Sequence, residues 1–151
     1  MNLFKFRVIV CCLLAFLSLH SFVVFGSSNP RQDVVNQTNQ FRKSTGLPPL
    51  VMREELNAIA QQHSVNMATG RIALGHHGFG KRNAMANQQI RGLHNFAENV
   101  ASGANSAAEV VTMWKNSAGH RRNMQGHYKY IGIGIATDKH GQIFYTEVFA
   151  G

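Results

Sequence analysis

The sequence predicts an α+β fold in which helices pack on a small antiparallel sheet. Two observations carry this prediction. Apolar residues recur at helical spacing in several stretches ahead of residue 120, whereas the last stretch of the chain alternates residue by residue, as strands do. Helices that come before and between the strands of such a sheet are layered on its apolar face.

The N-terminal segment, residues 1–26, has the pattern of a secretory signal peptide. Lys5 and Arg7 precede a long apolar run, and Gly26 offers a small residue for cleavage. An uncleaved membrane anchor is the alternative, because the run approaches the ~20 apolar residues that a membrane span requires. We expect cleavage and therefore a secreted or periplasmic protein, in which residues 27–33 form a short polar lead.

Composition limits the chemistry of the remaining domain, residues 34–151. Both cysteines, Cys11 and Cys12, lie in the apolar run, so disulfides and cysteine nucleophiles are excluded from the domain. Without Lys5 and Arg7 the chain has 13 Lys and Arg against seven Asp and Glu, a net charge of +6. The basic residues are scattered, which predicts a general attraction to anionic surfaces but no nucleic-acid partner.

The first two helices are expected at residues 34–45 and 53–68. Gly46 follows the first as a stop, and Glu54 and Glu55 lie in the first turn of the second, where negative charge suits the helix dipole. His63 falls on the apolar stripe of the second helix, which we interpret as a core histidine hydrogen-bonded within the fold. The other members of that stripe are Leu56, Ile59, Ala60 and Met67.

A later helix is expected to begin at Ser106 and to end at Gly119. Ser106 and Glu109 match a capping box, so Glu109 is interpreted as a cap and not as a catalytic acid. Residues 75–92 predict a loop with a short helix between 80 and 90, and residues 96–101 predict a strand. The expected inner face of the later helix is Val110, Met113, Trp114 and Ser117.

The C-terminal stretch predicts a β-hairpin with a turn at residues 138–141 and a return strand at 143–149. Ile131, Ile133 and Ile135 alternate with glycine or alanine, so one face of the first strand is nearly bare and a helix can approach it closely. Glu147 lies in phase with apolar residues of the return strand. If that face is buried, Glu147 needs a donor, for which an arginine or a histidine is the natural candidate.

Short motifs in the second half of the chain occur in a recognisable order. His76 stands in His-His-Gly-Phe, Glu98 in Ala-Glu-Asn-Val-Ala, and His120 in Trp-Lys-Asn-Ser-Ala-Gly-His-Arg-Arg-Asn-Met, followed by a terminal Tyr-Thr-Glu-Val-Phe. This order resembles the CAP superfamily, the SCP-domain proteins, and is most similar to their short, cysteine-poor bacterial branch. The resemblance covers residues 34–151 and implies a three-layer α-β-α sandwich.

The resemblance also implies a central cleft with two histidines and two glutamates. His76, Glu98 and His120 match three of these positions, whereas the second glutamate is replaced by Ser117. Consecutive residues of an extended segment point opposite ways, so only one of His76 and its neighbour is expected to face the cleft. The candidates for its rim are His77, Arg82, Ser117, Arg121 and Glu147, and one arginine is expected to anchor Glu98 or a loop carbonyl.

Two imidazoles and a carboxylate suit Zn²⁺ or another divalent metal with an open position for water, so His76, His120 and Glu98 are the candidate ligands. A purely structural hydrogen-bonded cluster is the alternative. We expect the protein to be a monomer. Three functions stay open for it: a cleft that binds a metal ion and/or a small or lipid-like ligand, a metal-dependent extracellular hydrolase, and a non-enzymatic surface interaction or defence protein. Because Ser117 removes a carboxylate, the sequence favours binding over catalysis.

Overall fold

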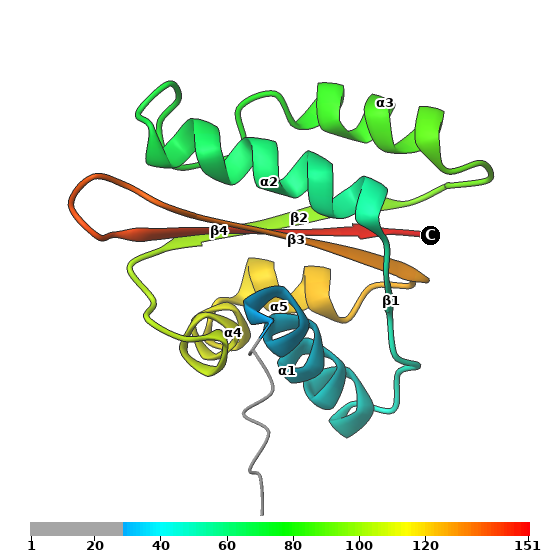
Figure 1. Cartoon of the computed structure of the whole chain (residues 1–151). Helices are drawn as coiled ribbons and strands as arrows, with labels where there is room; N and C mark the ends of the chain where they lie inside the picture. The colour runs from blue at the N-terminus through cyan, green and yellow to red at the C-terminus, as the bar shows by residue number, and fades with distance from the viewer. Residues whose placement is uncertain (1–28) are drawn as a thin grey trace, which may run out of the picture.

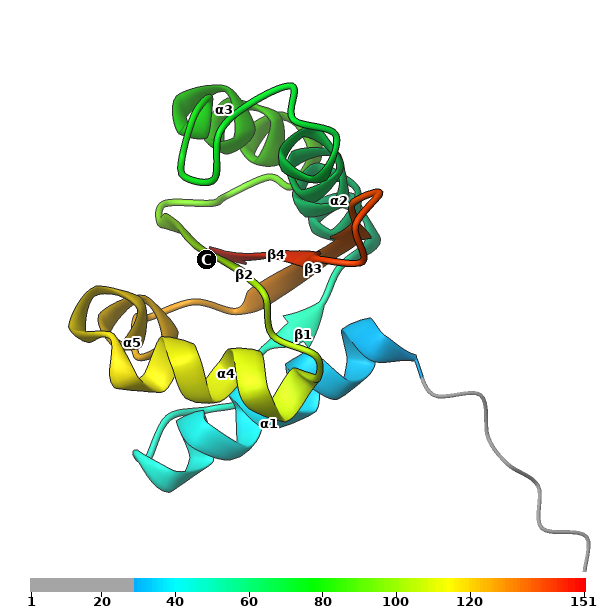
Figure 2. The ribbon, with the colours of Figure 1, turned by 90° about the vertical axis from the view of Figure 1, so that its left-hand side faces the viewer.

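Three layers stack in the computed structural model, which describes residues 29–151: a four-stranded sheet lies between two layers of helices (Figure 1). This is the predicted α-β-α sandwich. The predicted signal peptide lies outside the described residues, and among residues 29–151 no helix is long and apolar enough to cross a membrane. Two helices cover one face, α2 (Glu54–Ala68) and α3 (Phe79–Gln89), and three cover the other (Figure 2), α1 (Pro30–Ser44), α4 (Ala107–Asn116) and α5 (Ala118–Met124).

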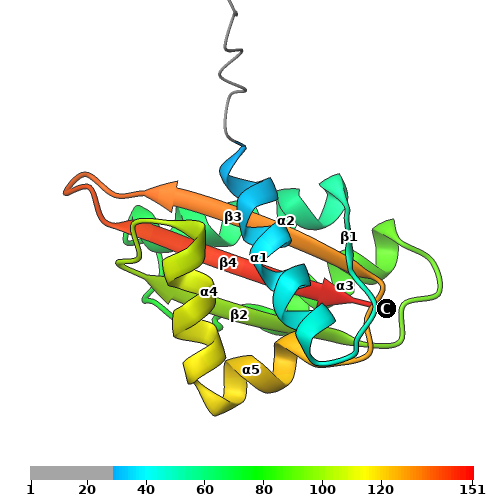
Figure 3. The same ribbon diagram turned by 90° about the horizontal axis from the view of Figure 1, so that it is seen from below.

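The sheet has the strand order β1-β3-β4-β2, so β2 forms one edge (Figure 3). β3 and β4 make the predicted antiparallel hairpin, and β2 pairs antiparallel with β4. β1 pairs parallel with β3, which makes the sheet mixed and not purely antiparallel as predicted. A strand of two residues shows too little alternation to be recognised in a sequence. The strands are β1 (Val51–Met52), β2 (Phe96–Ser102), β3 (Tyr130–Thr137) and β4 (Ile143–Ala150).

The predicted bare face of β3 is confirmed, and α2 rests on it. A Cβ atom at Gly132 would lie 2.3 Å from the carbonyl carbon of Leu56, and one at Gly134 would lie 2.2 Å from that of Ala60. These glycines therefore let the backbone of α2 touch the sheet. The predicted apolar stripe of α2 is buried, and His63 with it.

Two helices of the opposite layer have local start signals. Asn29 caps α1, since its Oδ1 accepts from the backbone N–H of Arg31 at 3.2 Å. α1 thus begins earlier than predicted, with Pro30 in the first turn, where a missing N–H does no harm. Ser106 Oγ accepts from the N–H of Glu109 at 3.2 Å, which confirms the predicted cap of α4; the Glu109 carboxylate, however, accepts from Asn105.

The predicted continuous helix up to Gly119 is wrong. Ser117 is extended (φ −94°, ψ 122°) and separates α4 from α5, and Gly119 lies within α5. Val110 and Trp114 are fully buried as predicted, but Met113 is 42% exposed. Val111 occupies the packed face in its place, because α4 turns a slightly different stripe toward the sheet.

Candidate functional site

Glu98, on the edge strand β2, is the centre of the candidate site, and its side chain is completely buried beneath α2 and α3. Arg82 of α3 binds both of its oxygens: Nε donates to Oε2 at 2.5 Å and Nη2 donates to Oε1 at 2.7 Å. Arg82 Nη1 also donates to the carbonyl of His77 at 2.6 Å. The expected arginine anchor is therefore Arg82, which holds the carboxylate and a loop carbonyl together.

His76 is hydrogen-bonded to the same carboxylate, with Nδ1 2.9 Å from Glu98 Oε1. Because an ionised carboxylate only accepts, Nδ1 carries a proton, and in the neutral ring Nε2 is the nitrogen with the free lone pair. Half of the His76 side chain is exposed. The neighbouring His77 is exposed and joins the cluster through its backbone carbonyl, so only the ring of His76 in this adjacent pair contacts Glu98.

His63 supports the loop that carries His76. It is buried on α2, and its Nε2 donates to the carbonyl of Gly75 at 2.8 Å while lying 3.7 Å from Glu98 Oε1. Burial lowers the pKa of His63, which keeps the ring neutral at neutral pH. The interpretation of His63 as a hydrogen-bonded core histidine is confirmed.

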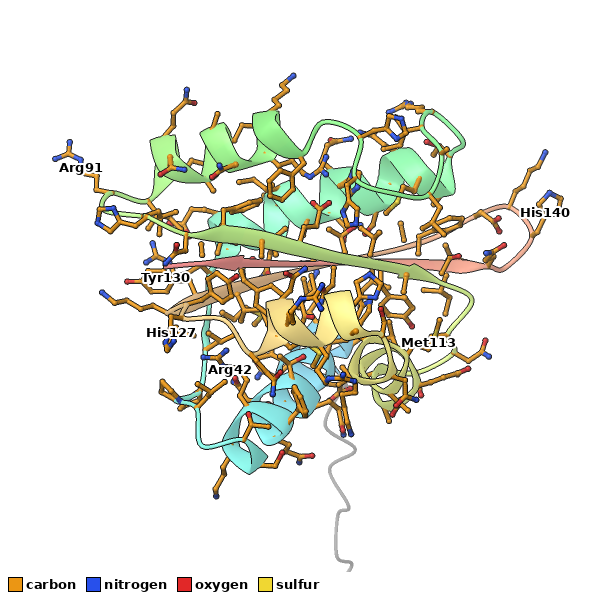
Figure 4. All side chains as sticks on the ribbon, turned by 180° about the vertical axis from the view of Figure 1, so that it is seen from behind. Arg42, Arg91, Met113, His127, Tyr130 and His140 are labelled. Atoms are coloured by element: carbon orange, nitrogen blue, oxygen red, sulfur yellow. The ribbon has the colours of Figure 1, made fainter. Side chains whose placement is uncertain are left out.

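His120 approaches from the other helical layer. It lies on α5, which runs along one side of β2 while α2 and α3 cover the other side (Figure 4). Burial lowers the pKa of His120, and the charge of a protonated His76 lowers it further. The His120 ring makes no hydrogen bond with any residue in the range 29–151.

Three rim candidates lie apart from Glu98. Ser117 is half-buried at the start of α5, and Arg121 is exposed, with Nη1 donating to the carbonyl of Lys115 at 2.8 Å. Glu147 faces the opposite side of the sheet, because residues alternate along β4 and its neighbour Val148 is the residue paired with Glu98. Its donors are Thr38 and Asn99, so the expectation of an arginine or histidine donor is wrong.

A cavity of about 380 Å³ lies between α2 and α3, beside the cluster. His63, His77 and Arg82 belong to both the cavity wall and the site. The wall also contains the apolar side chains of Ile59, Ile72 and Met85 and the exposed Lys81, and no acidic residue lines it.

The candidate metal ligands are reduced to two by this arrangement. Among residues 29–151, no three His, Cys, Asp or Glu side chains are grouped closely enough to hold a metal ion. Glu98 is occupied by Arg82 and His76, so it orients an imidazole and is not a free ligand. The donors that suit a divalent metal are the unprotonated ring nitrogens of His76 and His120.

Sequence reasoning missed the polar groups that connect β2 to α5. Asn99 Nδ2 donates to the carbonyl of His120 at 3.2 Å, and Asn123 Nδ2 donates to the carbonyl of Glu98 at 3.1 Å and to Asn99 Oδ1 at 3.0 Å. Both asparagines stand in the motifs that contain Glu98 and His120. The available signal for Asn99 was a polar residue between the apolar residues of the predicted strand at 96–101.

Comparison with known proteins finds a family match and a similar sequence. A model of the cysteine-rich secretory protein family, CAP, matches residues 35–149. The uncharacterized protein YkwD of Bacillus subtilis (strain 168) is 32% identical over 121 residues, which cover 78% of this chain and 46% of YkwD. The chain therefore spans less than half the length of this relative.

Solved structures share the fold. An extracellular protein containing an SCP domain from Bacillus anthracis superposes with a TM-score of 0.67 and 24% identity, over 80% of this chain and 39% of that one. An outer surface protein of Borrelia burgdorferi gives a TM-score of 0.69 and 19% identity, over 82% of this chain and 95% of that one. A family match over most of the described residues, together with this shared fold, shows that the chain belongs to the cysteine-rich secretory protein (CAP) family.

Proposed function

We propose that this protein is an extracellular CAP-domain protein whose cleft at the edge of the sheet binds a divalent metal ion between His76 and His120. The hydrogen bond from His76 Nδ1 to the buried Glu98 carries this proposal. In the neutral ring it fixes the tautomer that leaves Nε2 unprotonated and able to bind a metal ion. A carboxylate behind a metal-binding imidazole is the usual support of such ligands.

Zinc fits this donor set, because Zn²⁺ accepts neutral imidazole nitrogens and fills its other positions with water. When bound, such an ion lowers the pKa of its water to about 7. Hydrolysis also needs a general base that takes the proton of the attacking water. Glu98 is bound by Arg82 and Glu147 lies on the other face of the sheet, so neither carboxylate is placed for this role. The residues thus support metal binding better than the metal-dependent hydrolase.

Secretion is supported by the names of similar proteins and by the sequence of residues 1–26. The Bacillus anthracis protein is described as extracellular and the Borrelia burgdorferi protein as an outer surface protein, and a similar protein of Staphylococcus aureus is described as a cysteine-rich secretory protein. A cleaved signal peptide would deliver this chain to the same side of the membrane.

The cavity between α2 and α3 supports a second ligand, a small lipid-like anion. Its volume of about 380 Å³ falls within the range of small-molecule sites. Ile59, Ile72 and Met85 provide apolar walls, and Lys81 provides a positive charge at a mouth without acidic residues. An aliphatic carboxylate matches this combination of chemistry.

Isothermal titration of Zn²⁺ into the metal-free protein tests the metal site. We expect a dissociation constant of about 1 μM that weakens at least about tenfold in His76→Ala and in His120→Ala, because each removes one of two ligands. His140→Ala is the matched control, since His140 is exposed in the β3–β4 turn away from the cleft. Binding that survives both cleft substitutions, or is lost in His140→Ala, would contradict the proposal.

Decanoate is the probe for the cavity. We expect saturable binding that is weakened by Met85→Trp, which fills the cavity, and by Lys81→Ala, which removes the charge. Met113→Trp places the same bulk at an exposed position of the other helical layer and should leave binding unchanged. Equal affinities in all four proteins would rule out this cavity as the decanoate site.

A further inference from the structure

Glu147 is a fully buried carboxylate on the side of the sheet opposite Glu98. Thr38 Oγ1 of α1 donates to its Oε1 at 2.7 Å, and Asn99 Nδ2 of β2 donates to its Oε2 at 3.2 Å. Burial raises the pKa of Glu147 to about 7, although both donors and the charge of Arg42 lower it. Arg42 is the charged group that acts on Glu147, and the groups nearest it from β2 and β3 are uncharged.

Asn99 connects this carboxylate to α5 by hydrogen bonds. Its amide nitrogen donates to Glu147 and to the carbonyl of His120, both at 3.2 Å, and its Oδ1 accepts from Asn123 Nδ2 at 3.0 Å. Both the nitrogen and the oxygen of this amide are therefore used. Because Glu147 only accepts when ionised, it forces the nitrogen of Asn99 toward itself and toward His120.

α5 depends on such external contacts, because a helix of seven residues is not stable alone. Its far end is held by Arg42, whose Nη1 donates to the carbonyls of Met124 at 2.8 Å and Gly126 at 2.9 Å. This guanidinium is also fully buried and places a positive charge at the C-terminal end of the helix. Asn99 and Arg42 thus hold α5 at its two ends.

We propose that Glu147 is the positioning residue of the cleft: through Asn99 it fixes α5 against the edge strand and so sets where the His120 ring stands relative to His76. This inference rests on the proposed role of His120 as a ligand. Glu147 itself touches neither imidazole, so its effect on the cleft must pass through Asn99 and the backbone of α5.

Nuclear magnetic resonance of the metal-free protein tests the proposal. Glu147→Leu keeps the size of the side chain but removes the acceptor of Asn99, so the protection factors of the α5 amides should fall about tenfold. The pKa of His120 should return toward the ordinary value of about 6.5 as its ring loosens. Glu147→Gln should preserve both, because a glutamine oxygen can accept from Asn99 and its nitrogen can donate to Thr38.

Ser106→Ala is the control for a general loss of stability, because it removes the cap of α4 and should leave α5 protection and the His120 titration unchanged. If Glu147→Leu does not fold, a comparison of the wild type with Glu147→Gln still tests the positioning role. Protection of α5 should change between about pH 5 and 8 in the wild type and stay constant in Glu147→Gln.

A Glu147→Leu protein that matches Ser106→Ala in both readouts would overturn the positioning role, as would equal pH dependence in the wild type and Glu147→Gln. Zinc titration of the same proteins is a separate arm, in which Glu147→Leu should weaken binding about tenfold. Failure of the wild type to bind zinc would refute the proposed metal site. The α5 protection factors, which are measured without metal, would still test whether Glu147 positions α5.

Discussion

Arg82 is the charged partner of the buried Glu98. Both oxygens of Glu98 accept from this guanidinium, and the side chain of Glu98 has no exposed surface. Arg82→Ala should therefore lower the free energy of unfolding by about 3–5 kcal/mol, the usual loss when one partner of a buried ion pair is removed. Urea denaturation at neutral pH measures this loss.

Two further variants separate charge from geometry in this ion pair. Arg82→Lys keeps the charge but not the paired N–H groups, so its loss should be smaller than that of Arg82→Ala. Arg121→Ala removes an exposed arginine of the other helical layer and should change stability by less than about 0.5 kcal/mol. An Arg82→Ala protein as stable as Arg121→Ala would show that Glu98 is not a buried ion.

Glu147 makes the free energy of unfolding fall as the pH rises. Its pKa is raised from 4.5 to about 7, so the folded protein binds the proton more tightly than the unfolded chain does. The contribution of Glu147 is therefore complete below about pH 4.5 and is lost as the pH rises toward 7, by at most about 3 kcal/mol. Chemical denaturation of wild type and Glu147→Gln between pH 4.5 and 8 should show this fall in the wild type alone.

At the scale of elements, the contact between α2 and β3 has no room for a side chain. A Cβ at Gly134 would overlap the backbone of Ala60 and Gln61, which flexible side-chain motion cannot relieve. We expect Gly134→Ala to destabilise the protein by about 1–3 kcal/mol or more, measured by thermal unfolding.

Gly80→Ala is the matched control for that substitution. Gly80 lies in the first turn of α3, and apart from its chain neighbours and the backbone of its own helix no atom lies within 4 Å of the position that a Cβ would take, so alanine should stabilise by about 0.4–1 kcal/mol. Similar losses in both variants would mean that the sensitivity belongs to glycine in general and not to the helix–sheet contact.

Local patterns in the sequence predicted most of these elements. The stripe of α2, the cap of α4 and the alternating glycines of β3 each depend on residues close together in the chain. β1 and the break at Ser117 were missed, because a two-residue parallel strand and a change of helix direction are set by tertiary contacts.

The candidate site was predictable only in part for the same reason. The motifs selected His76 and Glu98, and the structure joins them by a hydrogen bond. Glu147 lies on β4 opposite Asn99, the neighbour of Glu98, and its side chain therefore falls on the other face of the sheet. The register of β2 against β4 decides which residues of β4 meet Glu98. That register is not visible in either strand alone.

At the scale of the whole molecule, the excess positive charge is confined to the surface. The buried carboxylates Glu98 and Glu147 are offset by the two buried arginines, Arg42 and Arg82. The net charge of +6 that remains without Lys5 and Arg7 therefore belongs to exposed side chains. We expect such a surface to attract anionic partners over distances set by the salt concentration.

Sedimentation with lipid vesicles measures this attraction. We expect the protein to bind vesicles that contain phosphatidylglycerol at about 0.05 M NaCl and to be released at about 0.5 M, because screening shortens the range of surface charges to a few ångströms. Neutral phosphatidylcholine vesicles should not bind it at either concentration. His120→Ala should behave as the wild type, since the cleft takes no part in this contact; binding that persists at high salt, or that His120→Ala abolishes, would assign the membrane contact to the cleft and not to the surface charge.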